Sequence, residues 1–298
     1  MPLRVGYVPE HFASPLLQYA ADDQGKTLVL TPFPGGTGAM TAALGNNEID
    51  VAVIRALTDA LIAGIAKGSH AYKLVGSYVQ TSLNWAVVTG KNSKFQSIED
   101  LRGTKIGISR IGRLTMAAVM AMQSDWKTPD GKVEIPEFQV NNDLKGLNSS
   151  VNDGSTSAFL WEWFTTKPYA DSGEVRFIGS VLTPWPSWLI AAHPSPDRAD
   201  PGILRSFLGR LTEYVRKFDE PREREQADVD FIRKHFGYEE HDIREWLKTV
   251  RWVEDCSAIS GKVIVDTLNI LDQAGVVQRP LDGFKVEDFI NHDVARII

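Results

Sequence analysis

Short apolar runs rich in β-branched residues alternate with longer stretches of helical periodicity over residues 1–70. The strand-like runs are LRVGYV, TLVLTPF and DVAVIRA, and the helix-like stretches are SPLLQYAADDQ, GTGAMTAALGNN and LTDALIAGIAKG. This alternation predicts a parallel sheet covered by helices. Ser14 and Pro15 are typical of an N-cap followed by a first-turn proline, and Gly25 is typical of a helix end. The first helix is therefore expected over residues 14–24.

The pattern changes after residue 70, where YKLVGSYVQ and LNWAVVTGK follow each other with only a short polar break. Two long strands without a helix between them predict that the chain crosses from one lobe to another. A second α/β series then runs through SIEDLRG, TKIGIS, the helical GRLTMAAVMAMQSDW, EFQV, a helix-like stretch from Asp143, SAFLWEW and VRFIGSV. SWLIAAH predicts a returning strand, and four helical stretches are expected from about 202 to 275.

Two α/β series joined by two crossings predict an α/β protein with two lobes and a discontinuous first lobe. Lobe I is expected to comprise 1–84 and 187–298, including the C-terminal helices, and lobe II to comprise 85–186. Pockets form at domain interfaces and at the carboxyl ends of parallel strands. The sequence therefore predicts a ligand cleft between the lobes.

Composition excludes several classes of function. Among 298 residues, 32 Lys and Arg oppose 38 Asp and Glu, and a net charge of −6 gives no general attraction for nucleic-acid phosphates. The single cysteine, Cys256, excludes an intrachain disulfide and a multi-thiolate zinc site. No uncharged run is long enough for a spanning helix, and the start MPLRVGYVPEH lacks the features of a secretory signal. We therefore expect no membrane insertion, and a cytoplasmic location.

Three segments carry a resemblance to a known family: SIEDLRGTKIGIS followed by Gly112, GTGAMTAALGNNEIDVAV, and SAFLWEWFTTKP. In order and spacing they resemble the type 2 periplasmic binding protein fold. The branch they resemble holds sulfonate-binding proteins and enzymes that make the thiamine pyrimidine precursor. YVPEHFASPLLQYAADDQG is similar to the precursor-synthesis branch, where a histidine follows the first strand. That branch has a cysteine-rich iron-binding stretch, which a chain with Cys256 alone lacks.

Two predicted helix starts have the residue types of an anion site. Gly35, Gly36, Thr37 and Gly38 precede a helix, where glycine permits close approach of the backbone and the first amides favour an anion. Thr37 as a simple N-cap is the alternative. Ser109 to Arg113 lie between a strand and a helix of the other lobe, where a guanidinium can fork onto a carboxylate, sulfonate or phosphate. Arginines that face solvent are the alternative there.

Polar and aromatic side chains near the predicted crossings complete the candidate site. His11 follows the first strand and is interpreted as an acid or base, a hydrogen-bond donor to the ligand, or a helix cap. Tryptophans near the crossings either stack on a flat ligand or pack in the core, and Glu162 either accepts from a ligand or pairs with an arginine. The predicted ligand-binding residues are Glu10, His11, Phe12, Gly36, Thr37, Gly38, Gln80, Thr81, Arg110, Ile111, Gly112, Arg113, Trp161, Glu162, Trp185, Pro186 and Ser187.

These observations predict a protein that binds a small polar molecule by hinge closure, without catalysis. The ligand is expected to be anionic, such as a sulfonate, carboxylate or phosphate, or pyrimidine-like. One alternative is a cytoplasmic enzyme related to thiamine pyrimidine precursor synthesis, with His11 or Glu162 as acid or base. Another is a ligand-controlled regulatory module, for which the sequence indicates no protein partner. No catalytic triad, metal-ligand cluster or cofactor motif is present, so no metal and no cofactor are expected.

Overall fold

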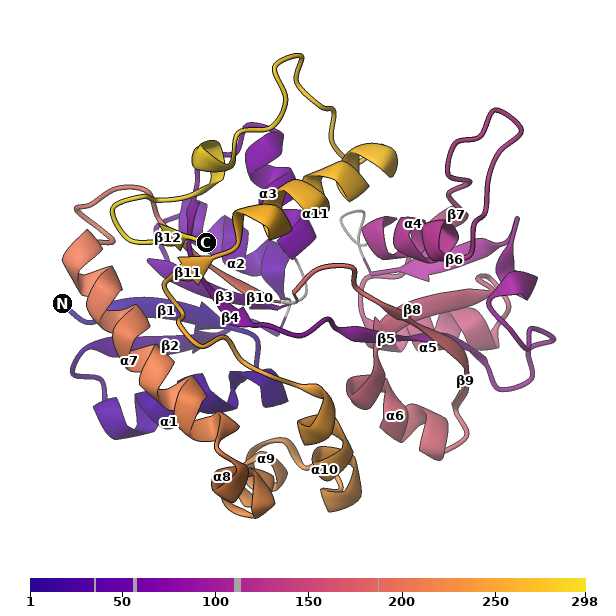
Figure 1. The fold of residues 1–298 in the computed structure, drawn as a ribbon. Coiled ribbons are helices and arrows are strands. Elements are labelled where there is room, and N and C mark those ends of the chain that lie inside the picture. The colour runs from indigo at the N-terminus through magenta and orange to yellow at the C-terminus, as the bar shows by residue number, and fades with distance from the viewer. Residues whose placement is uncertain (35, 56–57, 110–113, 187) are drawn as a thin grey trace. The chain divides into compact units, whose positions relative to one another are not determined.

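Residues 1–34, 36–55, 58–109, 114–186 and 188–298 are described by the structure, which is a computed structural model (Figure 1). Their chain contacts divide the molecule into two units. The first unit contains Met1–Thr81, Trp185–Leu268 and Pro280–Ile298, and the second contains Ser82–Pro184 and Asn269–Arg279. Each unit is built around its own five-stranded sheet.

The sheet of the first unit has the strand order β2-β1-β3-β10-β4. Its strands are β1 (Leu3–Tyr7), β2 (Leu28–Pro32), β3 (Val51–Arg55), β4 (Lys73–Val79) and β10 (Trp188–Ala192). β1 runs parallel to β2 and β3, whereas β10 runs antiparallel to β3 and β4. Trp188 at the start of β10 pairs with both Arg55 and Val79, the last residues of β3 and β4. The ends of β1 to β4 and the start of β10 therefore share one edge, the carboxyl edge of the first sheet.

The helices of the first unit come from both ends of the chain, and the last of them, α11, continues into the second unit. They are η1 (His11–Ala13), α1 (Ser14–Asp23), α2 (Thr37–Gly45), α3 (Thr58–Ala66), α7 (Pro201–Asp219), α8 (Pro221–Glu225), α9 (Ala227–Phe236), α10 (Glu240–Thr249) and α11 (Gly261–Gln273). The first helix matches its prediction closely, but Ser14 is its first helical residue and Ala13 is its N-cap. The Ser14 hydroxyl donates to the His11 carbonyl at 2.6 Å and caps no amide of the helix. Five helices stand between residues 201 and 273 where four were expected, since Pro221 starts a new helix after extended Glu220.

The sheet of the second unit has the strand order β7-β6-β8-β5-β9. Its strands are β5 (Asn84–Gly90), β6 (Lys105–Ile108), β7 (Glu137–Val140), β8 (Ala158–Glu162) and β9 (Val175–Leu182). β6 is parallel to β7 and β8, and β5 is antiparallel to β8 and β9. The elements around it are η2 (Glu99–Leu101), α4 (Leu114–Gln123), α5 (Leu144–Asn152) and α6 (Trp163–Asp171). The ends of β6, β7 and β8 form the carboxyl edge of the second sheet.

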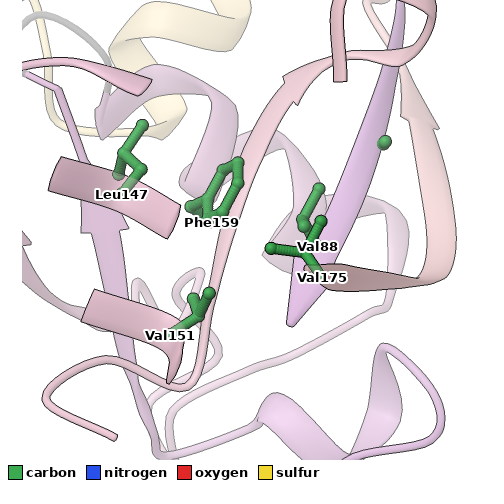
Figure 2. Close-up of a cluster of buried hydrophobic side chains, with 6 residues drawn as sticks. Val88, Leu147, Val151, Phe159 and Val175 are labelled. Carbon is green, nitrogen blue, oxygen red and sulfur yellow. The ribbon is translucent and has the colours of Figure 1, made fainter. Parts of the chain in front are cut away.

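A compact apolar cluster holds α5 against the second sheet. Figure 2 shows Leu147 and Val151 of α5 beside Phe159 of β8, with Val88 of β5 and Val175 of β9 nearby. Phe159 and Val88 are completely buried. Burial of such side chains stabilises a fold by about 1.5–3 kcal/mol each, so this cluster fixes the position of α5 on the sheet. Two short strands, β11 (Ala258–Ile259) and β12 (Arg296–Ile297), and the turn η4 (Val286–Phe289) complete the first unit.

Candidate functional site

The carboxyl edge of the first sheet gathers most of the residues predicted to bind a ligand. One group follows β1, a second follows β2, a third follows β4 and a fourth precedes β10. These residues are Glu10, His11, Phe12, Gly36, Thr37, Gly38, Gln80, Thr81, Trp185 and Pro186. Ligands of open α/β sheets bind beyond the carboxyl ends of the strands, so this edge is the candidate site of the first unit.

The first turn of α2 presents backbone amides at this edge. Gly36 is its N-cap and has a φ of 71° and a ψ of −156°, a conformation that only glycine adopts readily. Thr37 is thus the first helical residue and not the N-cap. Gly36 supplies no side-chain cap, the first turn contains no acidic residue, and the Gly38 amide has no acceptor among the described residues. Thr37 is buried, whereas Gly38 is exposed.

Two arginines bind the opposite end of α2 and the segment that follows it. Arg198 donates to the Leu44 carbonyl at 3.4 Å, to the Ile49 carbonyl at 2.5 Å and to Asp50 Oδ1 at 3.0 Å. Arg4 adds a bidentate contact to the same carboxylate, at 3.0 and 2.6 Å. Burial opposes ionisation of Asp50, but the hydrogen bonds from the two arginines hold its pKa below the ordinary value. One of these bonds reaches the last turn of α2, and the others hold the segment between α2 and β3.

Glu10, His11 and Phe12 are buried on and before η1. The His11 ring is only 1% exposed and meets Trp246 and Tyr238 edge to face, with centroids 4.4 and 5.0 Å away. The Phe12 carbonyl accepts a hydrogen bond from the Tyr78 hydroxyl at 3.0 Å. Glu10 precedes η1 in an extended conformation without capping it. This segment is therefore part of an aromatic core beneath the carboxyl edge.

Gln80 and Pro186 lie together on the wall of a cavity of about 420 Å³ in the first unit. The backbone amide of Gln80 donates to the Arg251 carbonyl at 2.9 Å. The Thr81 hydroxyl accepts from the backbone amide of Arg251 at 3.3 Å. Trp185 is buried in the first unit. Several residues between 253 and 263 also line the cavity, in a stretch where the sequence pattern predicted helices. Ser187 lies outside the described residues.

In the second unit, Trp161 and Glu162 end β8 at the carboxyl edge of their sheet. Trp161 meets Trp85 edge to face, with centroids 6.4 Å apart. Glu162 is 2% exposed, and its carboxylate accepts from the Thr165 amide and hydroxyl, both at 2.6 Å. Glu162 is thus the N-cap of α6, a role that the sequence pattern did not indicate. Arg110, Ile111, Gly112 and Arg113 lie outside the described residues.

Among the described residues, no group of three or more His, Cys, Asp or Glu side chains is arranged to hold a metal ion. None of the helices that the structure describes combines the length and the apolar character needed to span a bilayer.

Comparison with known proteins gives one family match. The profile of the family described as Ca3427-like PBP matches residues 85–181. The solved structure of the Candida albicans CA3427 gene product is 30% identical and superposes with a TM-score of 0.83, covering 98% of this chain and 96% of that chain. Its description assigns CA3427 to a new family with the generic periplasmic binding protein fold. A search of curated proteins found no significant match.

More distant structures share the fold. The alkanesulfonate-binding protein SsuA of Xanthomonas axonopodis pv. citri, bound to MOPS, is 13% identical with a TM-score of 0.72, over 100% of this chain and 98% of that chain. The nitrate-binding protein NrtA of Synechocystis is 13% identical with a TM-score of 0.70, over 98% and 86% of the two chains. The predicted fold class, an α/β periplasmic binding protein fold, is confirmed.

Proposed function

The chain belongs to the Ca3427-like family of proteins with the periplasmic binding protein fold, and we propose that it reversibly binds a small anionic molecule at the first turn of α2. One observation carries this proposal: α2 begins at the carboxyl edge of the first sheet with a glycine cap and without an acidic residue in its first turn.

The physical basis is the unsatisfied polarity of a helix start. The first amides of a helix lack internal acceptors, and the aligned peptide dipoles place about half a positive charge there. An anion satisfies both the amides and the dipole. Gly36 exposes the backbone, the Gly38 amide has no acceptor in the described part of the chain, and the Thr37 hydroxyl stands at the same turn. The site therefore favours an oxyanion such as a sulfonate, carboxylate or phosphate.

The fold neighbours support the same ligand class. Those whose names state a ligand include proteins for alkanesulfonates and for nitrate, which are oxyanions. Another neighbour was solved with L-arginine, which carries a carboxylate. These proteins share the fold at low identity, so they support the chemistry of the ligand class and do not identify the ligand.

Binding is better supported than catalysis by the contacts of the two residues considered as acid or base. The Glu162 carboxylate is used by the first turn of α6, through Thr165. His11 is enclosed by the rings of Trp246 and Tyr238 and is 1% exposed. A general acid or base must reach the proton that it transfers. We therefore place binding, followed by hinge closure of the two units, ahead of an enzymatic function.

The test is isothermal titration calorimetry with MOPS, nitrate, phosphate, benzoate and the neutral pyrimidine thymine. Two isosteric variants of the same helix form a matched pair: Thr37→Val at the first turn and Thr41→Val one turn later, where the hydroxyl donates to the Gly38 carbonyl at 3.0 Å. We expect Thr37→Val to weaken the best anion about tenfold, equivalent to about 1.4 kcal/mol. Thr41→Val should change affinity less than twofold.

Two results would overturn the proposal. One is the absence of saturable heat with every member of the panel. The other is a preference for thymine over all of the anions, because the start of α2 offers donors and positive potential rather than a flat apolar surface. Small-angle scattering of the best complex tests closure separately, through a decrease in the radius of gyration on ligand addition.

A further inference from the structure

We infer that a second binding site, for an uncharged amphipathic molecule, occupies the cavity of about 420 Å³ beside the first turn of α11. This α11 cavity is lined by residues of the first unit alone and includes none of the first turn of α2. Its volume lies within the range of small-molecule sites, about 300–1,000 Å³. The chemistry of its lining differs from that of the proposed anion site.

Part of the α11 cavity wall is apolar, and hydrogen bonds hold the strands that form it. Leu189 of β10, Ile259 of β11 and Val263 of α11 form apolar parts of the lining. The Ile298 amide donates to the Ile259 carbonyl at 3.0 Å, and the Gly261 amide donates to the Ile298 carbonyl at 3.0 Å. Ser77, which pairs with Leu189, donates its hydroxyl to the Ala258 carbonyl. These bonds tie β4, β11 and β12 together, so the walls are fixed before a ligand arrives.

The polar groups of the lining favour a neutral ligand. Arg296 Nη2 contacts Asp255 Oδ2 at 3.2 Å, while the Ser257 amide and hydroxyl donate to Asp255 Oδ1 at 2.8 and 2.7 Å. The Nε and Nη1 groups of Arg296 donate to no acceptor in the described part of the chain. Glu254 is a second acidic residue of the lining, so the lining residues carry two negative formal charges and one positive charge. An anionic guest would meet net negative charge, whereas a hydroxyl or carbonyl can accept from Arg296.

A ring or short aliphatic chain with one hydroxyl or carbonyl group matches this lining. Its apolar body would lie against Leu189, Ile259 and Val263, and its oxygen would accept from the unused donors of Arg296. Most small-molecule sites combine the same two features, an apolar lining and a few fixed polar groups. Gln80 and Pro186 also line the cavity, so an occupant would contact the chain where it leaves β4 and where it approaches β10.

The experiment uses para-fluorobenzyl alcohol as the probe, followed by fluorine NMR with the full chain. Val263→Trp fills the cavity, and Val265→Trp is the matched control, because both valines are half-buried on α11 but only Val263 lines the cavity. We expect saturable binding to the parent chain and to Val265→Trp, and at least tenfold weaker binding to Val263→Trp. Para-fluorobenzoate should bind at least fivefold more weakly than the alcohol to the parent chain.

A second measurement does not depend on the folding of a variant. In methyl-labelled parent protein, the alcohol should shift the methyl signals of Leu189 and Val263 at the same concentration at which its fluorine signal saturates. The inference is wrong if the alcohol shows no saturable binding, if these methyl signals do not move, or if Val263→Trp binds the probe as well as Val265→Trp does. Tighter binding of the benzoate would equally contradict it.

Discussion

The helices α2 and α5 occupy equivalent positions in the two sheets but begin in different ways. Each follows the outermost of three parallel strands, β2 in the first sheet and β7 in the second. α5 is capped by Asp143, whose carboxylate accepts from the Gly146 amide at 2.8 Å. α2 is capped by Gly36, which has no side chain to offer. The same architecture thus closes one helix start with the chain's own carboxylate and leaves the other available to an external anion.

The second unit repeats the closed arrangement at α6. Glu162 accepts from the Thr165 amide at 2.6 Å, so a carboxylate again occupies the first turn. A bound anion would have to displace these caps, and the carboxylates would repel it. The comparison is the reason why we propose the α2 start, rather than the α5 or α6 start, as the anion site.

The largest expected effect comes from giving α2 the acidic character of the α5 start. Gly38→Asp places a carboxylate in the first turn, where it should weaken binding of the best panel anion about 100-fold, because like charges in a binding site cost several kcal/mol. The helix itself should not suffer, since an acidic first-turn residue stabilises it by about 0.3–1 kcal/mol. Gly38→Asn is the neutral control and should retain affinity within about threefold. Calorimetry and thermal unfolding of both variants provide the measurements.

The second effect concerns α9, whose first turn carries a buried carboxylate. Asp228 is 1% exposed, and its pKa is raised from 3.8 to about 7, mainly by burial. A hydrogen bond from Gln18 lowers this pKa, and the nearby charge of Glu223 raises it. Arg224 lowers this pKa and Asp219 raises it. Because the folded-state pKa is raised, the folded state binds the proton more tightly. Stability is therefore lost as the pH rises from about 3.8 through about 7.

Asp228→Asn removes this penalty while keeping the side-chain shape. We expect its melting temperature to exceed that of the parent by several degrees at pH 8, with a smaller difference at pH 5. Thermal unfolding at the two pH values is the measurement. An equal difference at both values would show that the carboxylate is already ionised in the folded protein at pH 5.

The smallest effect is expected from opening the α5 start. Asp143→Ala removes the cap and should destabilise the protein by about 1 kcal/mol, a fall of about 2–4 °C in melting temperature. Asp143→Asn keeps a capping oxygen, so its melting temperature should fall by less than half as much. Affinity for the panel anion should stay within twofold in both variants. A clear loss of affinity in either variant would contradict the separate roles of the two helix starts.

Local patterns predicted the elements of the fold well. Alternating strands and helices indicated both sheets, and Ser14, Pro15 and Gly25 placed the first helix within one residue of its observed end at Asp23. These signals work because helix capping, proline geometry and strand periodicity depend on neighbours in the sequence. The glycine-rich start of α2 was visible for the same reason.

Long-range packing was not predictable from these patterns. The burial of His11 depends on Tyr238 and Trp246, more than 200 residues away in the sequence. The capping role of Glu162 depends on the backbone turning into a helix directly after β8, and glutamate is not among the usual N-cap residues. The α11 cavity likewise joins β4, β10, β11 and β12, segments that no local pattern places together.

Amide NMR with the panel anion is the decisive measurement of binding at α2, because it compares the two helix starts in one sample. We expect a saturable downfield shift of the Gly38 amide, because its proton gains an acceptor. The Gly146 amide should not change, since it already donates to Asp143. The shift of Gly38 should follow the same affinity that calorimetry measures. An anion that saturates the calorimetric titration without moving the Gly38 amide would contradict binding at α2.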